Sequence, residues 1–302
     1  MGNNWKIGLC FSLVTAVFWG LLPFALKSLL DQLDSLTITW YRFSAAALIA
    51  WLWYGRKHTP SLIELCRGPY WRFTLLAVLS LTCNYVLFLH GLNFITPAAA
   101  ELVIQLSPLL LLLGSLYFFN ETFSRRQWLG VFVFTAGLLL FFHHRFRELV
   151  DTDERYLIGV GLIVAAAVLW TVYALSQKKI TQQFKANHLL LLIYIGGSLI
   201  YLPFASPLDV VNLSGTQWAV LAFASLNTII AYGSFGHAMS HWDASRVSAV
   251  ITLAPLITLG FGMLMHWLVP GSVEVEPMDA LNWLGGVLVV VGSVMAALSP
   301  SD

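Results

Sequence analysis

Long apolar stretches recur from one end of this chain to the other, and they constrain its fold more than any other feature. Each stretch has about 15 to 23 residues, and a helix needs about 20 apolar residues to cross the hydrocarbon core of a bilayer. Runs such as Leu109 to Leu113 are apolar on every face, which favours helices over the alternating strands of a barrel. The sequence therefore predicts an all-α integral membrane protein with ten transmembrane helices. The predicted spans are Ile7–Leu26, Leu36–Trp53, Phe73–Leu92, Ala98–Phe119, Trp128–Phe142, Tyr156–Ser176, His188–Phe204, Trp218–Ala238, Val247–Val269 and Leu281–Leu298.

Composition excludes several classes of protein. The 302 residues are 58% hydrophobic and 10% charged, whereas a soluble domain carries about a quarter charged residues. The net charge of +1 comes without a clustered basic face, which argues against a nucleic-acid role. Neither a phosphate-binding loop nor a metal-ligand spacing is evident, so we expect no cofactor and no metal.

The chain repeats itself. Adding 147 to a residue number in the third and fourth spans, or 151 in the first, leads to the equivalent position in the second half, and several of these pairs are identical residues. Each half holds five predicted spans, an odd number, so equivalent helices must cross in opposite directions. The sequence thus predicts two inverted five-helix repeats, residues 1–148 and 149–302, an arrangement typical of alternating-access transporters. The matching pairs include Trp71 and Trp218, Tyr85 and Tyr232, Pro108 and Pro255, Trp19 and Trp170, and Lys27 and Lys178.

The loop charges predict the orientation. With the N-terminus in the cytoplasm, eleven Lys and Arg residues fall in inside loops and four in outside loops. This bias follows the positive-inside rule. We therefore expect a multi-pass protein of a bacterial inner membrane, with both termini cytoplasmic and the segment His143–Arg155 in an outside loop.

Two ionisable side chains, Arg42 and Glu101, lie inside predicted spans, where charges are costly and need a partner or a wet cavity. Both fall in the outer third of the membrane. They could bind a zwitterionic solute, Arg42 taking its carboxylate and Glu101 its ammonium group. Alternatively, they could form a permanent ion pair that ties two helices together. Glu101 is also the candidate for proton coupling, since it is the one carboxylate within a predicted span.

Polar residues form a stripe on the helix that carries Glu101. Residues at i, i+4 and i+7 share one helical face. A matching stripe runs along the ninth span, and each leads to a proline that we expect to bend its helix. We count the polar members as candidate solute contacts; the stripes consist of Glu101, Gln105 and Pro108, and of Ser248, Thr252 and Pro255.

Four repeated aromatic residues, Trp19, Trp170, Tyr85 and Tyr232, lie away from the predicted span ends. Their polar edges need hydrogen-bond partners, which a central cavity could supply. The alternative is ordinary helix packing.

Charged residues at the span ends also allow two interpretations. Lys27 and Lys178 are explained by snorkelling toward the lipid head groups. Glu121 lies in a predicted cytoplasmic turn and is either a solvated charge or a lock that pairs with Arg125 or Arg126.

A set of motifs is spread over the first five predicted spans: Phe18, Trp19 and Gly20, Arg42, Pro108, Asn120 and Glu121, and Gly130 and Gly137. With these motifs the chain resembles the drug/metabolite transporter superfamily and, within it, the EamA family. The second half departs from the pattern, because Leu268 stands where a match to Glu121 would fall. The resemblance implies a ten-helix secondary transporter, a monomer or homodimer in the lipid bilayer, that exports amino acids or similar small molecules.

Two other classes of function are the alternatives, and we expect neither, because the sequence shows no clustered nucleophile and base or metal set and its loops are short. A membrane-embedded enzyme would need a clustered nucleophile and base or a set of metal ligands. A non-transporting sensor or scaffold would be expected to carry a soluble partner domain.

Overall fold

The computed structural model describes residues 4–53, 59–141, 143, 154–269 and 279–299, and within these ranges every regular element is a helix. The boundary predicted between the two repeats, at residues 148 and 149, lies outside the described residues. The elements are α1 (Trp5–Leu30), α2 (Ser35–Trp53), α3 (Thr59–Arg67), α4 (Trp71–Gly91), α5 (Pro97–Ile104), α6 (Leu106–Phe119), α7 (Arg125–Phe141), α9 (Glu154–Thr181), α10 (Ala186–Tyr201), η2 (Pro207–Asn212), α11 (Gly215–His241), α12 (Ala244–Ile251), α13 (Ala254–Leu268) and α14 (Ala280–Leu298).

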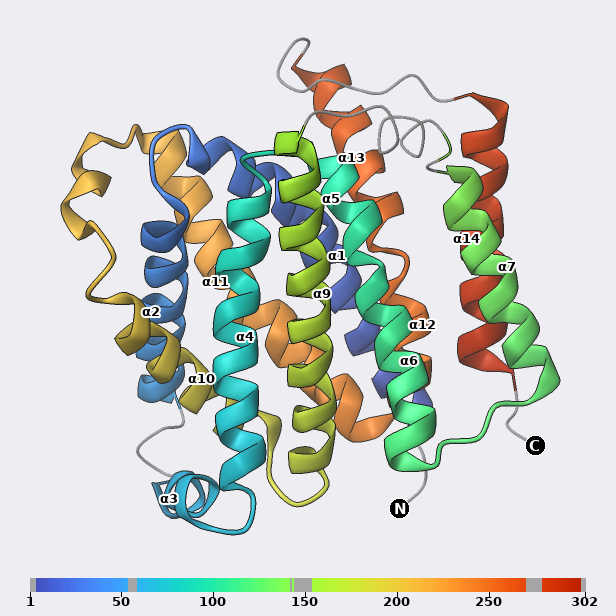
Figure 1. The fold of residues 1–302 in the computed structure, drawn as a ribbon, viewed down its shortest axis with the longest axis horizontal. Helices are drawn as coiled ribbons and strands as arrows, with labels where there is room; N and C mark the ends of the chain where they lie inside the picture. The colour runs from blue at the N-terminus through green and yellow to red at the C-terminus, as the bar shows by residue number, and fades with distance from the viewer. Residues whose placement is uncertain (1–3, 54–58, 142, 144–153, 270–278, 300–302) are drawn as a thin grey trace.

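The long helices stand side by side in one bundle with two ends (Figure 1). We call the end where α1 begins and where α6, α11 and α14 finish the N-terminal face. The other end, where α1 finishes and α9 and α11 begin, is the opposite face. The first and last helices of the bundle therefore have their free ends on the same side (Figure 1).

Seven of the described helical segments are long and apolar enough to cross a membrane, and α10 is a shorter apolar helix. Two of the seven are the composite segments α5 with α6 and α12 with α13. Their outward surfaces carry many exposed Leu, Phe and Trp side chains, as expected for contact with lipid. The chain is thus a helical membrane protein, and ten crossings remain a prediction. The sequence did not predict the short helix α3.

Prolines interrupt both composite segments at equivalent places. Proline removes a backbone donor and clashes with the carbonyl four residues earlier. For Pro108 and Pro255 that earlier residue is Ile104 and Ile251, and these are the residues at which α5 and α12 end. The helix is therefore interrupted for one or two residues before each proline, once in each half, while the backbone there stays in the right-handed helical region.

Helices α7 and α14 pack with their backbones almost in contact. A Cβ atom added at Gly292 would lie 2.2 Å from the backbone nitrogen of Phe134, and one added at Gly137 would lie 2.6 Å from that of Val289. Small residues allow such an approach in membranes, where close packing replaces the hydrophobic effect between helices.

Side-chain amides bind the two ends of this helix pair. The Gln127 amide donates to the carbonyl of Ala296 over 3.3 Å, and the Asn282 amide donates to that of Phe141 over 2.6 Å. Adding 155 takes Gln127 to Asn282 and Phe141 to Ala296, so the same bond occurs twice.

The pairs α1 with α11 and α4 with α9 show a similar correspondence. The Thr15 hydroxyl donates to the carbonyl of Ala231 over 3.3 Å, and the Asn84 amide donates to that of Ala166 over 2.8 Å. The repeat offsets take residue 15 to 166 and residue 84 to 231. The two halves therefore contact each other at equivalent positions with different donors.

Candidate functional site

A cavity of about 100 Å³ opens in the half of the bundle nearer the opposite face, and it has room for several water molecules. Its wall comes from α1, α2, α4, α5, α6, α9, α11, α12 and α13. Most of the predicted site residues line it: Trp19, Arg42, Tyr85, Glu101, Gln105, Trp170 and Tyr232, together with Pro108. Further lining residues that the sequence did not single out for this role include Leu22, Leu26, Asn84, Phe88 and Ser107.

Arg42 reaches the cavity from α2 and is 3% exposed. Its Nε donates to the hydroxyl of Thr228 over 3.1 Å and to the carbonyl of Ala224 over 3.3 Å. The guanidinium carbon lies 4.4 Å from the ring centre of Tyr85, a favourable cation–π distance. These contacts fix the side chain through one nitrogen, and its two terminal nitrogens have no hydrogen-bond partner among the described residues.

Glu101 reaches the same cavity from α5 and is 5% exposed. Within the described ranges no ion pair joins it to Arg42, so the predicted permanent ion pair is absent from this conformation. One turn further along, the Oε1 atom of Gln105 is buried and accepts no hydrogen bond from a described residue. The cavity wall thus holds a guanidinium, a carboxyl group and a free amide oxygen that do not satisfy one another.

The aromatic residues form the floor of the cavity. The ring centre of Trp19 lies 5.4 Å from that of Trp170 and 5.3 Å from that of Tyr232, both in edge-to-face geometry. Tyr85 lies 5.5 Å from Tyr232. Since these rings come from four different helices, they close the cavity on its side toward the N-terminal face.

The two remaining polar candidates lie apart from the cavity. The Ser248 hydroxyl donates to the carbonyl of Pro108, and the Thr252 hydroxyl donates to the carbonyl of Ala249 over 2.6 Å. Both are buried and bound to backbone at the broken helices, so they do not line the cavity in this conformation. Pro255 likewise lies outside its wall.

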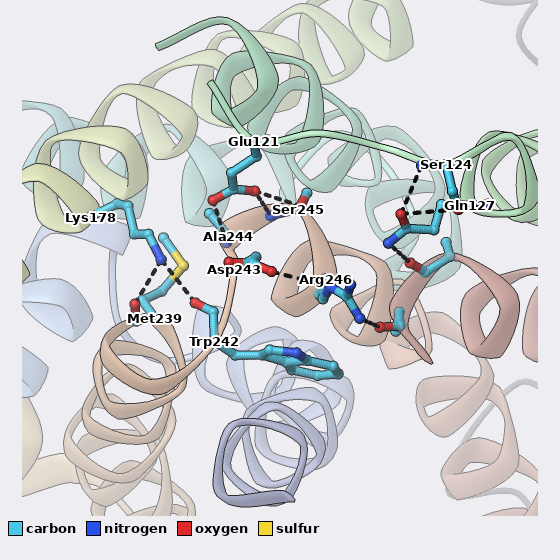
Figure 2. A network of polar contacts seen from close by, with 12 residues as sticks. Glu121, Ser124, Gln127, Lys178, Met239, Trp242, Asp243, Ala244, Ser245 and Arg246 are labelled. Atoms are coloured by element: carbon cyan, nitrogen blue, oxygen red, sulfur yellow. Dashed lines mark hydrogen bonds and ion pairs between the residues drawn. The ribbon is translucent and has the colours of Figure 1, made fainter. Parts of the chain in front are cut away.

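A network of polar contacts closes the N-terminal face (Figure 2). The Glu121 carboxylate accepts from the backbone N–H groups of Ala244 and Ser245 over 3.0 and 3.1 Å, and from the Ser245 hydroxyl over 2.5 Å. These donors stand at the N-terminus of α12, where the helix dipole favours a negative charge. The contact joins the end of α6 to the start of α12.

The sequence offered Arg125 or Arg126 as the partner with which Glu121 could form a lock, and the structure shows other partners. Both arginines are exposed, and no ion pair links either of them to Glu121 in the part of the chain that the structure describes. The lock therefore uses backbone donors far away in the sequence, which local charge spacing could not reveal.

Two lysines bind the carboxyl ends of neighbouring helices. The Lys178 ammonium donates to the carbonyls of Met239 and Trp242 over 3.0 and 2.8 Å (Figure 2), and Lys27 donates to the carbonyl of Leu92 over 2.5 Å. Orphan carbonyls at a helix end attract cations. The prediction that both lysines reach toward the lipid head groups was therefore incomplete, because it left out these hydrogen bonds to backbone carbonyls.

The cavity, with its buried charges, and the closed face beyond it are features of a protein that handles a small solute within the membrane, and comparison with known proteins decides the family. The model of the EamA-like transporter family matches residues 6–143 and again residues 157–298. The chain belongs to the EamA-like transporter family. It is therefore a membrane transporter.

Relatives support this membership along nearly the whole chain. A Haemophilus influenzae protein named "Uncharacterized transporter" is 35% identical over 97% of this chain and 95% of its own. The Escherichia coli "Uncharacterized inner membrane transporter YhbE" is 33% identical over 97% of this chain and 91% of its own. An Escherichia coli "Probable amino-acid metabolite efflux pump" is 22% identical over 93% and 91%.

One solved crystal structure has the same fold. It superposes with a TM-score of 0.71 at 18% identity and covers 96% of both chains.

Proposed function

We propose that this transporter exports amino acids or similar zwitterionic metabolites across the inner membrane by alternating access. The observation that carries the proposal is that the Arg42 guanidinium and the Glu101 carboxyl group are buried and face one cavity without pairing. An uncompensated charge is costly inside a membrane, so each side chain needs a ligand or water in the cavity. A zwitterion supplies a carboxylate for the two terminal nitrogens of Arg42 and an ammonium group for Glu101.

The two family matches support an architecture of two inverted five-helix repeats, residues 1–148 and 149–302. The equivalent breaks before Pro108 and Pro255, and the twice-repeated contacts of α7 with α14, fit such a pair. Ten crossings place both termini on one side, and the loop charges make that side the cytoplasm. The cavity then faces outward, and the Glu121 network closes the cytoplasmic side.

Glu101 is the residue that we propose for proton coupling. It is the acidic group in the cavity wall, and a carboxylate at membrane depth can exchange its charge for a proton when solute enters or leaves. The repeated helix pairs provide a way for a proton gradient to drive transport, because each half can adopt the conformation of the other and the protein can so open to either side.

A ligand screen tests the proposal. The purified protein is heated with amino acids, nucleosides and amines in turn, and we expect saturable stabilisation by zwitterionic amino acids. Arg42→Gln should remove the response to amino acids while leaving the protein folded. Stabilisation by nucleosides or amines alone, or an unchanged amino-acid response in Arg42→Gln, would contradict the proposed substrate class.

A further inference from the structure

A stripe of side chains on α9 continues from the cavity floor toward the N-terminal face. Trp170, Tyr173 and Gln177 lie at i, i+3 and i+7 and so share one face of the helix. Trp170 lines the cavity, and the ring of Tyr173 lies 5.8 Å from that of Tyr232. The Gln177 amide presses against α11, since a Cβ atom added at Gly236 would lie 2.5 Å from its Nε2. The stripe ends beside the network that closes the N-terminal face.

The polar atoms of this stripe are buried without partners. Gln177 is fully buried, and neither its Oε1 nor its Nε2 forms a hydrogen bond with a described residue. The Tyr173 hydroxyl and the Trp242 indole N–H are in the same state. Most buried polar groups in proteins are satisfied, and each exception calls for an explanation. Leucine would fill the place of Gln177 without this cost.

The repeat shows which positions these are. Subtracting 151 takes Tyr173 to Leu22 and Gln177 to Leu26, and both leucines line the open cavity. The same pair of positions therefore borders an open space in one half and a closed, polar contact in the other.

We propose that Tyr173 and Gln177 are solute contacts of a second vestibule, which opens toward the N-terminal face when the outer cavity closes. The inference rests on the alternating access proposed above. A neutral amide both donates and accepts, and a phenol does the same, so the site suits a small solute of no net charge that carries both kinds of group. A zwitterion leaving Arg42 and Glu101 would meet these uncharged partners on its way to the other side, and weak contacts allow its release.

The first test separates a functional glutamine from a structural one. Gln177→Leu reproduces the residue of the other half and removes both orphan atoms, so the melting temperature should stay the same or rise. Exchange of a ¹⁴C-labelled mixture of amino acids across proteoliposomes should nevertheless fall by about fivefold or more. Gln183→Leu, at an exposed glutamine just beyond α9, is the matched control and should exchange normally. A stabilised Gln177→Leu variant with undiminished exchange would overturn the proposal.

The second test needs no substrate. Gln177→Cys and its counterpart Leu26→Cys are made singly in a background in which Cys10, Cys66 and Cys83 are replaced by alanine, and each is reacted with a methanethiosulfonate reagent. Breaking the closed face with Glu121→Leu should raise the reaction rate at position 177 by about tenfold and lower it at position 26.

The outcomes distinguish two failures. A position 177 that stays unreactive with and without Glu121→Leu would show a permanently closed core and overturn the second vestibule. A rise at both positions would support the vestibule under the closed face but contradict alternating access, and with it the proposed function.

Discussion

Replacing Glu121 should shift the balance between the two conformations that we propose for the transporter, because its carboxylate joins α6 to α12 across the closed N-terminal face. Three donors converge on it: the N–H groups of Ala244 and Ser245 and the Ser245 hydroxyl. All three bonds must break if these helices separate, whereas a conformation open at this face has no use for them. Glu121→Leu removes the three bonds and copies the residue of the other half, Leu268.

The size of the shift follows from these contacts. A hydrogen bond to a charged group stabilises by about 1.5–3 kcal/mol when it is shielded from solvent. Glu121 is half-buried, and water replaces its partners in the open state, so about 1 kcal/mol a bond is the better figure. The loss of about 3 kcal/mol corresponds to about a hundredfold change in the equilibrium constant, at 1.4 kcal/mol for each tenfold. Glu121→Gln keeps the acceptor oxygen and loses the charge, so we expect about tenfold.

Distances between spin labels measure this equilibrium. Labels at Thr122 and Ser240, two exposed positions on the N-terminal face, should give one short distance in the parent protein and a second, longer one in Glu121→Leu. Glu121→Gln should show an intermediate population. Arg126→Gln removes an exposed charge from the next turn and is the control. Identical distance distributions in the parent and Glu121→Leu would refute the reasoning, because the three bonds would then contribute nothing to closure.

Three further predictions concern packing, the charged pair and the asymmetry of the two halves. Gly292→Ala should lower the melting temperature, because its Cβ would strike the backbone of α7, while Gly161→Ala, with nothing within 4 Å, should leave it unchanged or raise it. In proteoliposomes, Glu101→Gln should abolish transport driven by a pH gradient and weaken the binding of zwitterionic amino acids. Normal transport by the Arg42→Gln, Glu101→Gln double variant would show that neither side chain takes part in transport. Leu268→Glu should favour closure of the opposite face and slow the labelling of a cysteine in the outer cavity; unchanged labelling would contradict the correspondence of the two halves.

The sequence predicted the architecture of the membrane helices better than the contacts at their ends. Apolar length and the positions of Pro108 and Pro255 indicated where helices run and where they bend, because these properties act within a few residues. The repeat likewise predicted that Trp19, Trp170 and their tyrosine partners would meet around a cavity. Such residues can be found because divergence has removed most other identities between the halves.

The missed features depend on distant parts of the chain. The partners of Glu121 are backbone N–H groups more than a hundred residues away, and backbone donors leave no mark in a sequence. Lys27 and Lys178 bind backbone carbonyls, and these partners could not be predicted for the same reason. Ser248 does not line the cavity in this conformation, and its hydroxyl donates to the carbonyl of Pro108, a partner 140 residues away that the sequence could not indicate. The sequence did indicate that the two lysines are equivalent, since the repeat takes Lys27 to Lys178, but it did not indicate which groups they bind.

The asymmetry between Glu121 and Leu268 connects the closed face to the charged cavity. The lysine contacts each join helices of one half and are both present in this conformation, so they do not distinguish the two closures. The Glu121 carboxylate joins the two halves, and it strengthens only the closure of the N-terminal face. The empty transporter should therefore rest with its cavity open to the opposite face. A solute can shift this equilibrium only by binding the second conformation more tightly than the first. A zwitterion of the proposed substrate class that bridged Arg42 and Glu101 would remove the cost of enclosing two unpaired ionisable groups, and that gain could offset the roughly 3 kcal/mol needed to separate Glu121 from α12. Arg42 and Glu101 would then be coupled to Glu121, because the cavity would close readily only around a solute that pairs with both cavity side chains.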